Sequence, residues 1–339
     1  MLAAKVILLF FVAGKQGIQK LIYWLLWASG ILLFYLAFRN IPIEELKEEI
    51  YTVKPVYLFL LLIPSWGGQF IRAWRWQLLL GNKVSYKAIY HSLLFGYFVN
   101  LALPRVGEIS RCAALQKTDG SPFGKNLGTV VIERATDVFF LLLVVFAAFW
   151  MQSGELKTWM DGRLIQPIAH LFSGHGGMAA MLLFASAIAF WVAWYIYKKV
   201  KTKLNTKLNA LIQEMIEGIK SLMKMSKAKM LLFLLLSAGI WACYFLTTWF
   251  WFQALPSANG ASFGMAFTVM VMGSIVKTLP IQGGGAGAYH LVIGELLVLF
   301  GLGNLSSKTF ALLNHGYQTV FYLLFGGFSA IWVGLKKKK

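Results

Sequence analysis

The residues that could support chemistry in this chain lie in a few charged or glycine-rich motifs inside long apolar stretches. The first motif is Pro104-Arg-Val-Gly-Glu-Ile-Ser-Arg111. If it is helical after its glycine, Arg105, Glu108 and Arg111 recur every three residues and share one face. Two arginines against one glutamate leave a spare positive charge, so we interpret this face as a cavity lining. The alternative is that Glu108 only neutralises its neighbours.

A second charged motif, Glu133-Arg-Ala-Thr-Asp137, interrupts the apolar run 127–151. In a helix Glu133 and Asp137 lie on the same face, and Arg134 is turned about 100° away from Glu133. Two roles remain open for the carboxylates: direct contact with a ligand, or salt bridges to an arginine elsewhere. Both place this helix against the first motif, and the candidate partners are Arg75, Arg105 and Arg111.

The third motif is the glycine run between Pro280 and His290. A glycine loop that follows a strand can hold a nucleotide phosphate, but this one lies between two apolar runs. We therefore interpret it as a tight turn whose backbone N–H groups can meet an anion at the start of a helix. His290 has packing as its alternative to a proton relay. The candidate lining residues are Gln282, Gly284, Gly285 and His290.

Signatures of catalysis are missing from the sequence. The three aspartates are not adjacent, the histidines lack HxxxH or HExxH spacing, and there is neither a GxSxG elbow nor a Walker A motif. We predict no metal site, no cofactor and no catalytic residue, and hence no enzyme.

Composition identifies the environment of these motifs. Of 339 residues, 58% are hydrophobic and 13% are charged, with a mean hydropathy of +0.66, against roughly 45–50% and about 25% in soluble proteins. Soluble classes are thereby excluded. The net charge of +19 then reports membrane topology, because lysines collect in cytoplasmic loops, and we predict no nucleic-acid partner.

The apolar runs predict an all-α, multi-pass protein of the cell membrane. Lysine-rich segments at 1–20, 198–229 and 336–339 predict cytoplasmic N- and C-termini. An amphipathic helix at 203–225 is expected on the cytoplasmic leaflet, with binding to a partner as the alternative. The basic tail 336–339 should favour anionic lipid headgroups. The expected spans are 21–38, 55–80, 88–103, 106–116, 127–151, 178–197, 230–252, 263–279, 286–301 and 309–335.

Counting crossings predicts two broken hairpins, 88–118 entering from the cytoplasm and 263–301 entering from outside. Each contains an LPxxG sequence, at 103–107 and 279–283. The chain then divides into a first membrane repeat, 21–151, an external loop, 152–177, and a second, inverted repeat, 178–335. Such an inverted repeat of about 4+4 helical elements favours a transport site near the midplane. Arg72 and Arg75, which lie among tryptophans, are expected to anchor a span at the interface.

These motifs, taken in order, resemble the membrane domain of the lysylphosphatidylglycerol synthase/flippase family. The resemblance rests on Arg72-Ala-Trp-Arg75-Trp76, the two charged motifs and the glycine run, and it covers roughly residues 20–335. It implies a polytopic helical domain that binds a lipid or moves it across the bilayer. Bifunctional members carry a soluble aminoacyl-transferase domain after this region. This chain stops at Lys339, so we expect a stand-alone flippase-like member without synthase activity.

The leading functional hypothesis is therefore a flippase for an anionic phospholipid or a polyprenyl-linked lipid. Arg105, Arg111 and Arg75 would hold the phosphate, while Glu108, Glu133 and Asp137 would set the charge balance. Arg134 is a further candidate for substrate binding. The alternatives are a membrane enzyme that modifies a lipid headgroup, and a scaffold subunit of an envelope enzyme. Self-association into a homo-oligomer stays open.

Overall fold

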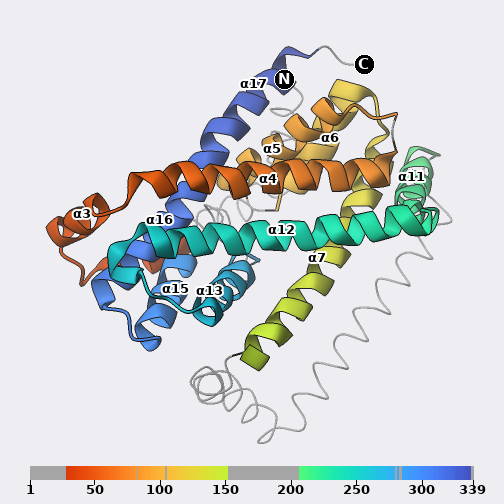
Figure 1. The fold of residues 1–339 in the computed structure, drawn as a ribbon. Helices are drawn as coiled ribbons and strands as arrows, with labels where there is room; N and C mark the ends of the chain where they lie inside the picture. Colours follow the sequence, from red (N-terminus) through yellow and green to blue (C-terminus); the bar gives the residue numbers. More distant parts are fainter. Residues whose placement is uncertain are drawn as a thin grey trace, which may run out of the picture.

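All regular elements of the described residues are helical, as the sequence predicts. The computed structural model describes residues 28–81, 83–103, 105–151, 206–278, 281 and 285–336. Segment 1–20, loop 152–177 and span 178–197 lie outside these ranges. The helices (Figure 1) are Ala28–Phe38, α3 (Ile43–Tyr51), α4 (Pro55–Leu80), α5 (Tyr86–Ala102), α6 (Gly107–Asp119), α7 (Phe123–Met151), α11 (Thr206–Met223), α12 (Lys227–Ala254), α13 (Phe263–Val276), α15 (Ala288–Leu299), α16 (Asn304–Phe321) and α17 (Gly327–Leu335).

Two long apolar helices, α4 and α12, lie side by side along the molecule (Figure 1). α4 begins with Pro55, whose fixed φ and missing N–H suit a first helical position, and it ends at Gly81 with a φ of 92°. It continues through Pro64, as membrane helices do where neighbours cover the freed backbone groups. Ser226 caps α12 by accepting a hydrogen bond from the N–H of Lys229.

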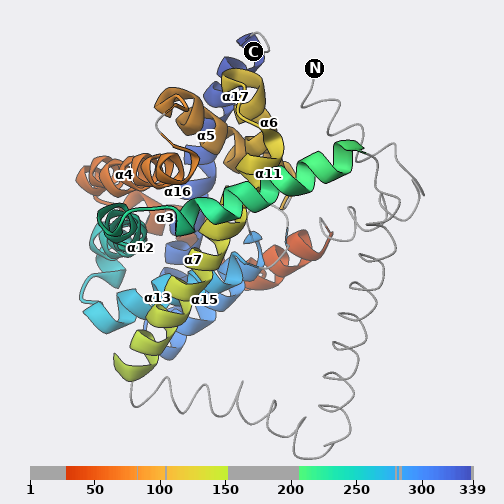
Figure 2. The ribbon, with the colours of Figure 1, turned by 90° about the vertical axis from the view of Figure 1, so that its right-hand side faces the viewer.

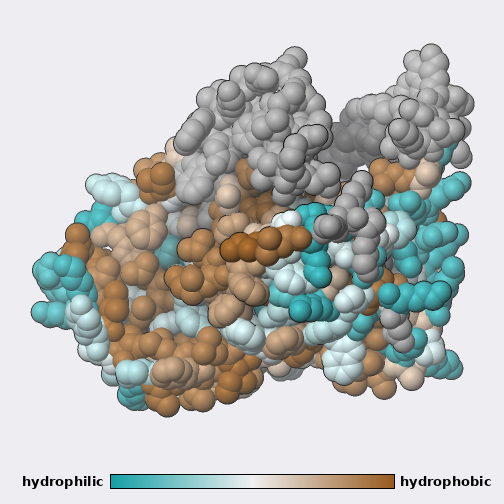
Figure 3. Space-filling view, turned by 90° about the horizontal axis from the view of Figure 1, so that it is seen from above, coloured by the Kyte–Doolittle hydropathy of each residue, from teal (hydrophilic) through white to brown (hydrophobic). Residues whose placement is uncertain are grey.

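Within the described residues, three helical stretches are long and apolar enough to cross a membrane: α4, α12 and the continuous run Asn304–Leu335. The third includes a π-helical turn at Tyr322–Gly326 between α16 and α17. Large apolar side chains are exposed along them, among them Phe59 at 71% and Ile331 at 64%. Figure 3 shows this apolar surface between polar ends. Exposed apolar area of this extent is that of a protein surrounded by lipid, so the chain is an all-α membrane protein.

The first broken hairpin is formed by α5 and α6. Its base is closed where the N–H of Ser85 donates to Asp119. At the break, Asn100 accepts a hydrogen bond from the N–H of Gly107, which satisfies one free donor at the start of α6. Gly107 and Gly96 bring the two backbones into contact, since a Cβ on Gly107 would collide with the carbonyl oxygen of Gly96.

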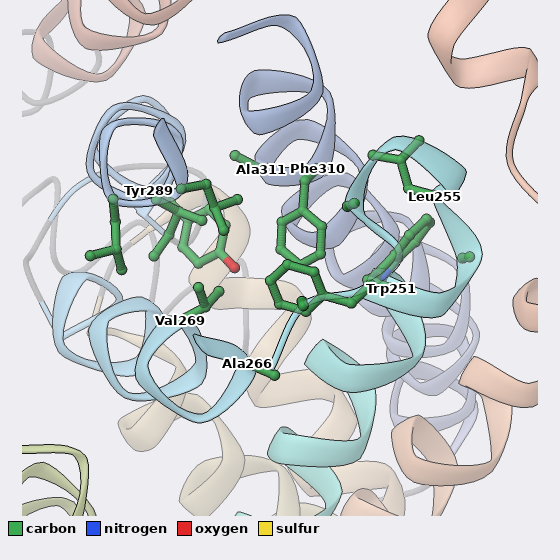
Figure 4. Close-up of a cluster of buried hydrophobic side chains, with 14 of the residues drawn as sticks. Trp251, Leu255, Ala266, Val269, Tyr289, Phe310 and Ala311 are labelled. Atoms are coloured by element: carbon green, nitrogen blue, oxygen red, sulfur yellow. The ribbon is translucent and has the colours of Figure 1, made fainter. Parts of the chain in front are cut away.

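The second broken hairpin is formed by α13 and α15, which pack against each other and against α16. Gly273 of α13 lets the ring of Tyr289 approach, because a Cβ there would lie 2.8 Å from that ring. The surrounding core is aromatic and aliphatic, and in it the tilted rings of Phe310 and Phe252 lie 4.2 Å apart between centroids. Figure 4 shows Tyr289, Phe310 and Trp251 in this core.

Two features of the fold differ in detail from the sequence-based expectation. The stretch 39–54, which joins the expected spans 21–38 and 55–80, contains the nine-residue helix α3. α11 lies in the expected amphipathic segment and packs across α7 (Figure 2). Glu214 of α11 accepts a hydrogen bond from the N–H of Gly124, so this helix covers the start of α7. Its contact with a lipid leaflet stays a prediction.

We predict that Gly218→Leu destabilises the protein, because a Cβ on Gly218 of α11 would collide with the carbonyl oxygen of Lys125 and lie 2.9 Å from the Cα of Gly128. Overpacking of this kind costs about 1–3 kcal/mol. The midpoint of thermal unfolding in one detergent measures it. Gly316→Ala is the control, since a Cβ there meets nothing within 4 Å. Equal midpoints for both variants would contradict the close α7–α11 contact.

Candidate functional site

The charged motifs of α4, α6 and α7 meet in one buried network. Arg75 is fully buried and donates to Asp137 at 2.7 Å, to Ser237 at 3.2 Å and to Glu133 at 3.3 Å. Arg111 donates to the other oxygen of Glu133 at 2.8 Å. Glu133 is thus held between two guanidinium groups that come from different helices. Charges at this depth are tolerated because each has an opposite partner.

Aromatic residues complete this network. The guanidinium of Arg111 lies 4.5 Å from the ring centre of Trp76, a cation–π contact. The indole N–H of Trp76 donates to Thr129 of α7 at 2.9 Å. Trp76 therefore ties α4 to α6 and α7 on the side opposite Arg75, and it is itself fully buried.

The interfacial role expected for Arg72 and Arg75 is wrong. Their exposed fractions are 6% and 0%, so neither reaches a water interface. Arg72 lies 3.8 Å from Asp137 and over the ring of Tyr244. The reason is their position on the helix. Both lie on the face of α4 that packs on α7 and α12, close to the carboxylates of Glu133 and Asp137.

A small pocket adjoins the network between α5, α6 and α7. The network contains four guanidinium groups, those of Arg72, Arg75, Arg111 and Arg134. Three carboxylates oppose them: Glu133 and Asp137 in ion pairs, and Glu108 in the cavity wall. One positive charge is left over. We call this space the charged cavity; its lining residues are Leu93, Gly96, Tyr97, Asn100, Gly107, Glu108, Arg111 and Arg134.

Arg134 is the arginine most available to a ligand in the charged cavity. Its side chain is 40% exposed, whereas that of Arg111 is 4% exposed, and its ion pair with Asp137 is long, at 3.5 Å. Asp137 is shared with Arg75 and Arg72. One oxygen of Glu108 and the Nε of Arg134 are buried without a hydrogen-bond partner. The cavity can therefore accept an anion through Arg134 and a hydrogen-bond donor through Glu108.

Arg105 lies apart from this cavity, at the tip of the first hairpin. It is exposed, has a φ of 67°, which side chains rarely adopt, and donates to the carbonyl oxygen of Thr278. Thr278 directly follows α13, so the breaks of the two hairpins touch each other. The structure thus assigns Arg105 a contact between hairpins, while its predicted hold on a phosphate stays a prediction.

In the second hairpin, His290 is buried and its Nδ1 accepts a hydrogen bond from the N–H of Gly287. Its ring packs edge-on against Phe34, 5.0 Å away. These contacts favour the packing role for His290 over a proton relay. His290 is not among the residues of the charged cavity. Gly285 has a φ of 91° and serves the turn. Gln282 and Gly284 lie outside the described residues.

Sequence analysis missed Lys277. Its Nζ donates to Gln318 at 2.6 Å and lies 4.7 Å above the ring of Tyr289. Within the described ranges no carboxylate lies in ion-pair distance of it. The hydroxyl of Tyr289 in turn accepts from Asn314 at 2.8 Å. One signal was available: Lys277 is the single lysine of 263–301 and directly precedes the Thr-Leu-Pro sequence.

The fold and site together define an all-α membrane protein with an anion-compatible cavity among broken helices. Comparison with known proteins gives the family: residues 7–326 match the lysylphosphatidylglycerol synthase TM region, and the chain belongs to that family. It is also 31% identical over 124 residues to the UPF0104 membrane protein MJ1595 of Methanocaldococcus jannaschii, a match that covers 33% of this chain and 37% of that relative. No solved structure matches the chain.

We predict that Arg75→Met and Arg134→Met differ sharply in their effect on stability. Arg75→Met leaves Glu133 and Asp137 short of a buried partner, and loss of one member of a buried pair costs about 3–5 kcal/mol. Arg134→Met removes a longer and partly exposed pair, whose side chains are 40% and 18% exposed, and its loss should cost less. Thermal unfolding of both purified variants in one detergent measures the difference. If Arg134→Met unfolds at the lower temperature, the assignment of the two arginines is wrong.

Proposed function

We propose that this protein binds an anionic membrane lipid by its phosphate in the charged cavity and moves that lipid across the bilayer. The observation that carries the proposal is the surplus of one positive charge in the network of buried arginines, of which Arg134 is the most exposed member. A charge at membrane depth is costly unless it serves a ligand or pathway. A phosphate would neutralise it and accept hydrogen bonds from the guanidinium.

Membership in a family described by a lipid-synthase membrane region supports a lipid as the ligand. The contact between the two hairpin breaks at Arg105 and Thr278 supports movement as the action. Broken helices that meet within a membrane protein can change their mutual packing without exposing backbone groups to lipid. An opening at one break is thereby coupled to the other, which is what a translocation path requires.

For orientation we propose that the end of the molecule carrying α11 faces the cytoplasm and the end carrying α3 faces outward in the cell membrane. Figure 1 places these helices at opposite ends of α4. Lysines gather at the α11 end, and glutamates gather on α3. This asymmetry follows the positive-inside rule. The lysines near α11 are Lys83, Lys87, Lys125, Lys220, Lys224, Lys227 and Lys229.

An enzyme that modifies a lipid headgroup is the second candidate function. The observation that favours it is the unpartnered oxygen of Glu108 in the cavity wall, which is placed as a general base would be. Both oxygens of the neighbouring carboxylate, Glu133, are held by arginines. A mass change in phosphatidylglycerol after incubation with the purified protein would favour the enzyme over the flippase.

We predict that Arg134→Gln slows lipid translocation several-fold without loss of folded protein. In vesicles holding tail-labelled phosphatidic acid, wild-type protein should exceed protein-free vesicles in the rate at which label becomes accessible to an external quencher. Arg39→Gln is the matched control, because Arg39 is exposed and outside the cavity. The flippase proposal fails if wild-type protein moves no lipid. The site assignment fails if the two variants lose the same amount of activity.

A further inference from the structure

A second small pocket lies between α4, α12 and the α16–α17 run. Among the described residues its lining carries no charged side chain. It differs in this from the charged cavity, although both open on the same pair of stacked rings: Tyr97 of the charged cavity lies 4.7 Å from Tyr322 of this one. We call it the neutral cavity. Its polar lining residues are Ser65, Gln69, Tyr244, Thr247, Gln318 and Tyr322.

Hydrogen-bonding capacity in the neutral cavity is incomplete without a ligand. Gln69 is buried, with an exposed fraction of 4%. Its Nε2 donates to the hydroxyl of Tyr322, and its Oε1 has no hydrogen-bond partner. A buried polar atom without a partner costs about 1–3 kcal/mol. Either orientation of the amide leaves one polar atom facing the cavity, because a hydroxyl can both donate and accept.

The opposite wall offers a donor. The Oε1 of Gln318 accepts a hydrogen bond from Lys277, so the amide is oriented with its oxygen toward the lysine. Its NH₂ group then has only a long contact of 3.5 Å, with Asn314. The neutral cavity thus presents an acceptor at Gln69 and a donor at Gln318. A group that both donates and accepts satisfies both walls, and a hydroxyl is such a group.

We propose that the neutral cavity binds the hydroxyl-bearing part of a lipid headgroup, such as a glycerol or a sugar. Its lining offers a phosphate no cation and an ammonium group no carboxylate. Tyr244 and Phe321 add aromatic rings to this lining. The lipid character of this ligand rests on the proposed function. On that basis the phosphate lies in the charged cavity and the hydroxyls lie beyond the tyrosine pair.

Cys243 lies in the wall of the neutral cavity and provides the test. The chain has two cysteines, and the other, Cys112, is fully buried. The full chain is placed in phosphatidylcholine nanodiscs and treated with N-ethylmaleimide, and intact mass with peptide mapping follows modification of Cys243. The added lipids are phosphatidylglycerol, glucosyl diacylglycerol and phosphatidic acid, each in a separate sample.

We expect phosphatidylglycerol and glucosyl diacylglycerol to slow the modification of Cys243 several-fold, and phosphatidic acid to leave it unchanged. Gln69→Leu should abolish this protection, and Gln77→Leu, on the same helix but outside the cavity, should retain it. Equal protection by phosphatidic acid would overturn the proposal, as would protection by no lipid. A Cys243 that is never modified would also overturn it, since the cavity would then be closed to a headgroup-sized molecule.

Protection by glucosyl diacylglycerol separates this inference from the proposed function, because that lipid has no phosphate. It should persist in Arg134→Gln, whose charged cavity has lost its free cation. If translocation fails while this protection holds, the neutral cavity is a headgroup site in a protein that does not transport. If protection fails while translocation holds, only the inference about hydroxyl groups is lost.

Discussion

Burial of Arg75 between two carboxylates is the constraint on which the first half of this molecule depends. A guanidinium taken out of water is tolerated only with close, well-directed partners, and Arg75 finds them on α7 and α12. Glu133 then draws in Arg111 from α6, so a single carboxylate links the broken hairpin to the long helices. In a protein whose apolar side chains gain little from leaving lipid for one another, such polar contacts specify which helices are neighbours.

The same network defines what is left for a ligand. Arg75 and Arg111 both contact Glu133, and Asp137 is shared by three arginines. The network therefore keeps one positive charge in surplus, and Arg134 is its most exposed arginine. The positive charge of the charged cavity therefore results from the way the surrounding helices pack. A neutral cavity lies on the other side of the Tyr97–Tyr322 pair, and the two together suit a headgroup that is anionic in one part and hydroxylated in another.

Much of the helix pattern is predictable from the sequence, since apolar runs and lysine placement are local signals. The span 55–80 coincides with α4, and both broken hairpins occur where proline and glycine interrupt the apolar runs. Choice of partner is not local. Nothing in the sequence distinguishes an interfacial arginine from Arg75, because its burial depends on where α7 and α12 pack. Lys277 and Gln69 were missed for the same reason: their importance comes from an absent carboxylate and an unmade hydrogen bond, which only packing reveals.

The central claim is that the buried arginines are structural and that Arg134 meets the ligand. An experimental structure in nanodiscs containing phosphatidylglycerol tests it most directly. We predict phosphate density between α5, α6 and α7 within hydrogen-bond distance of Arg134, with Arg75 still in contact with Glu133. Phosphate density on Arg75, with Glu133 displaced, would contradict the account, and so would a charged cavity that stays empty.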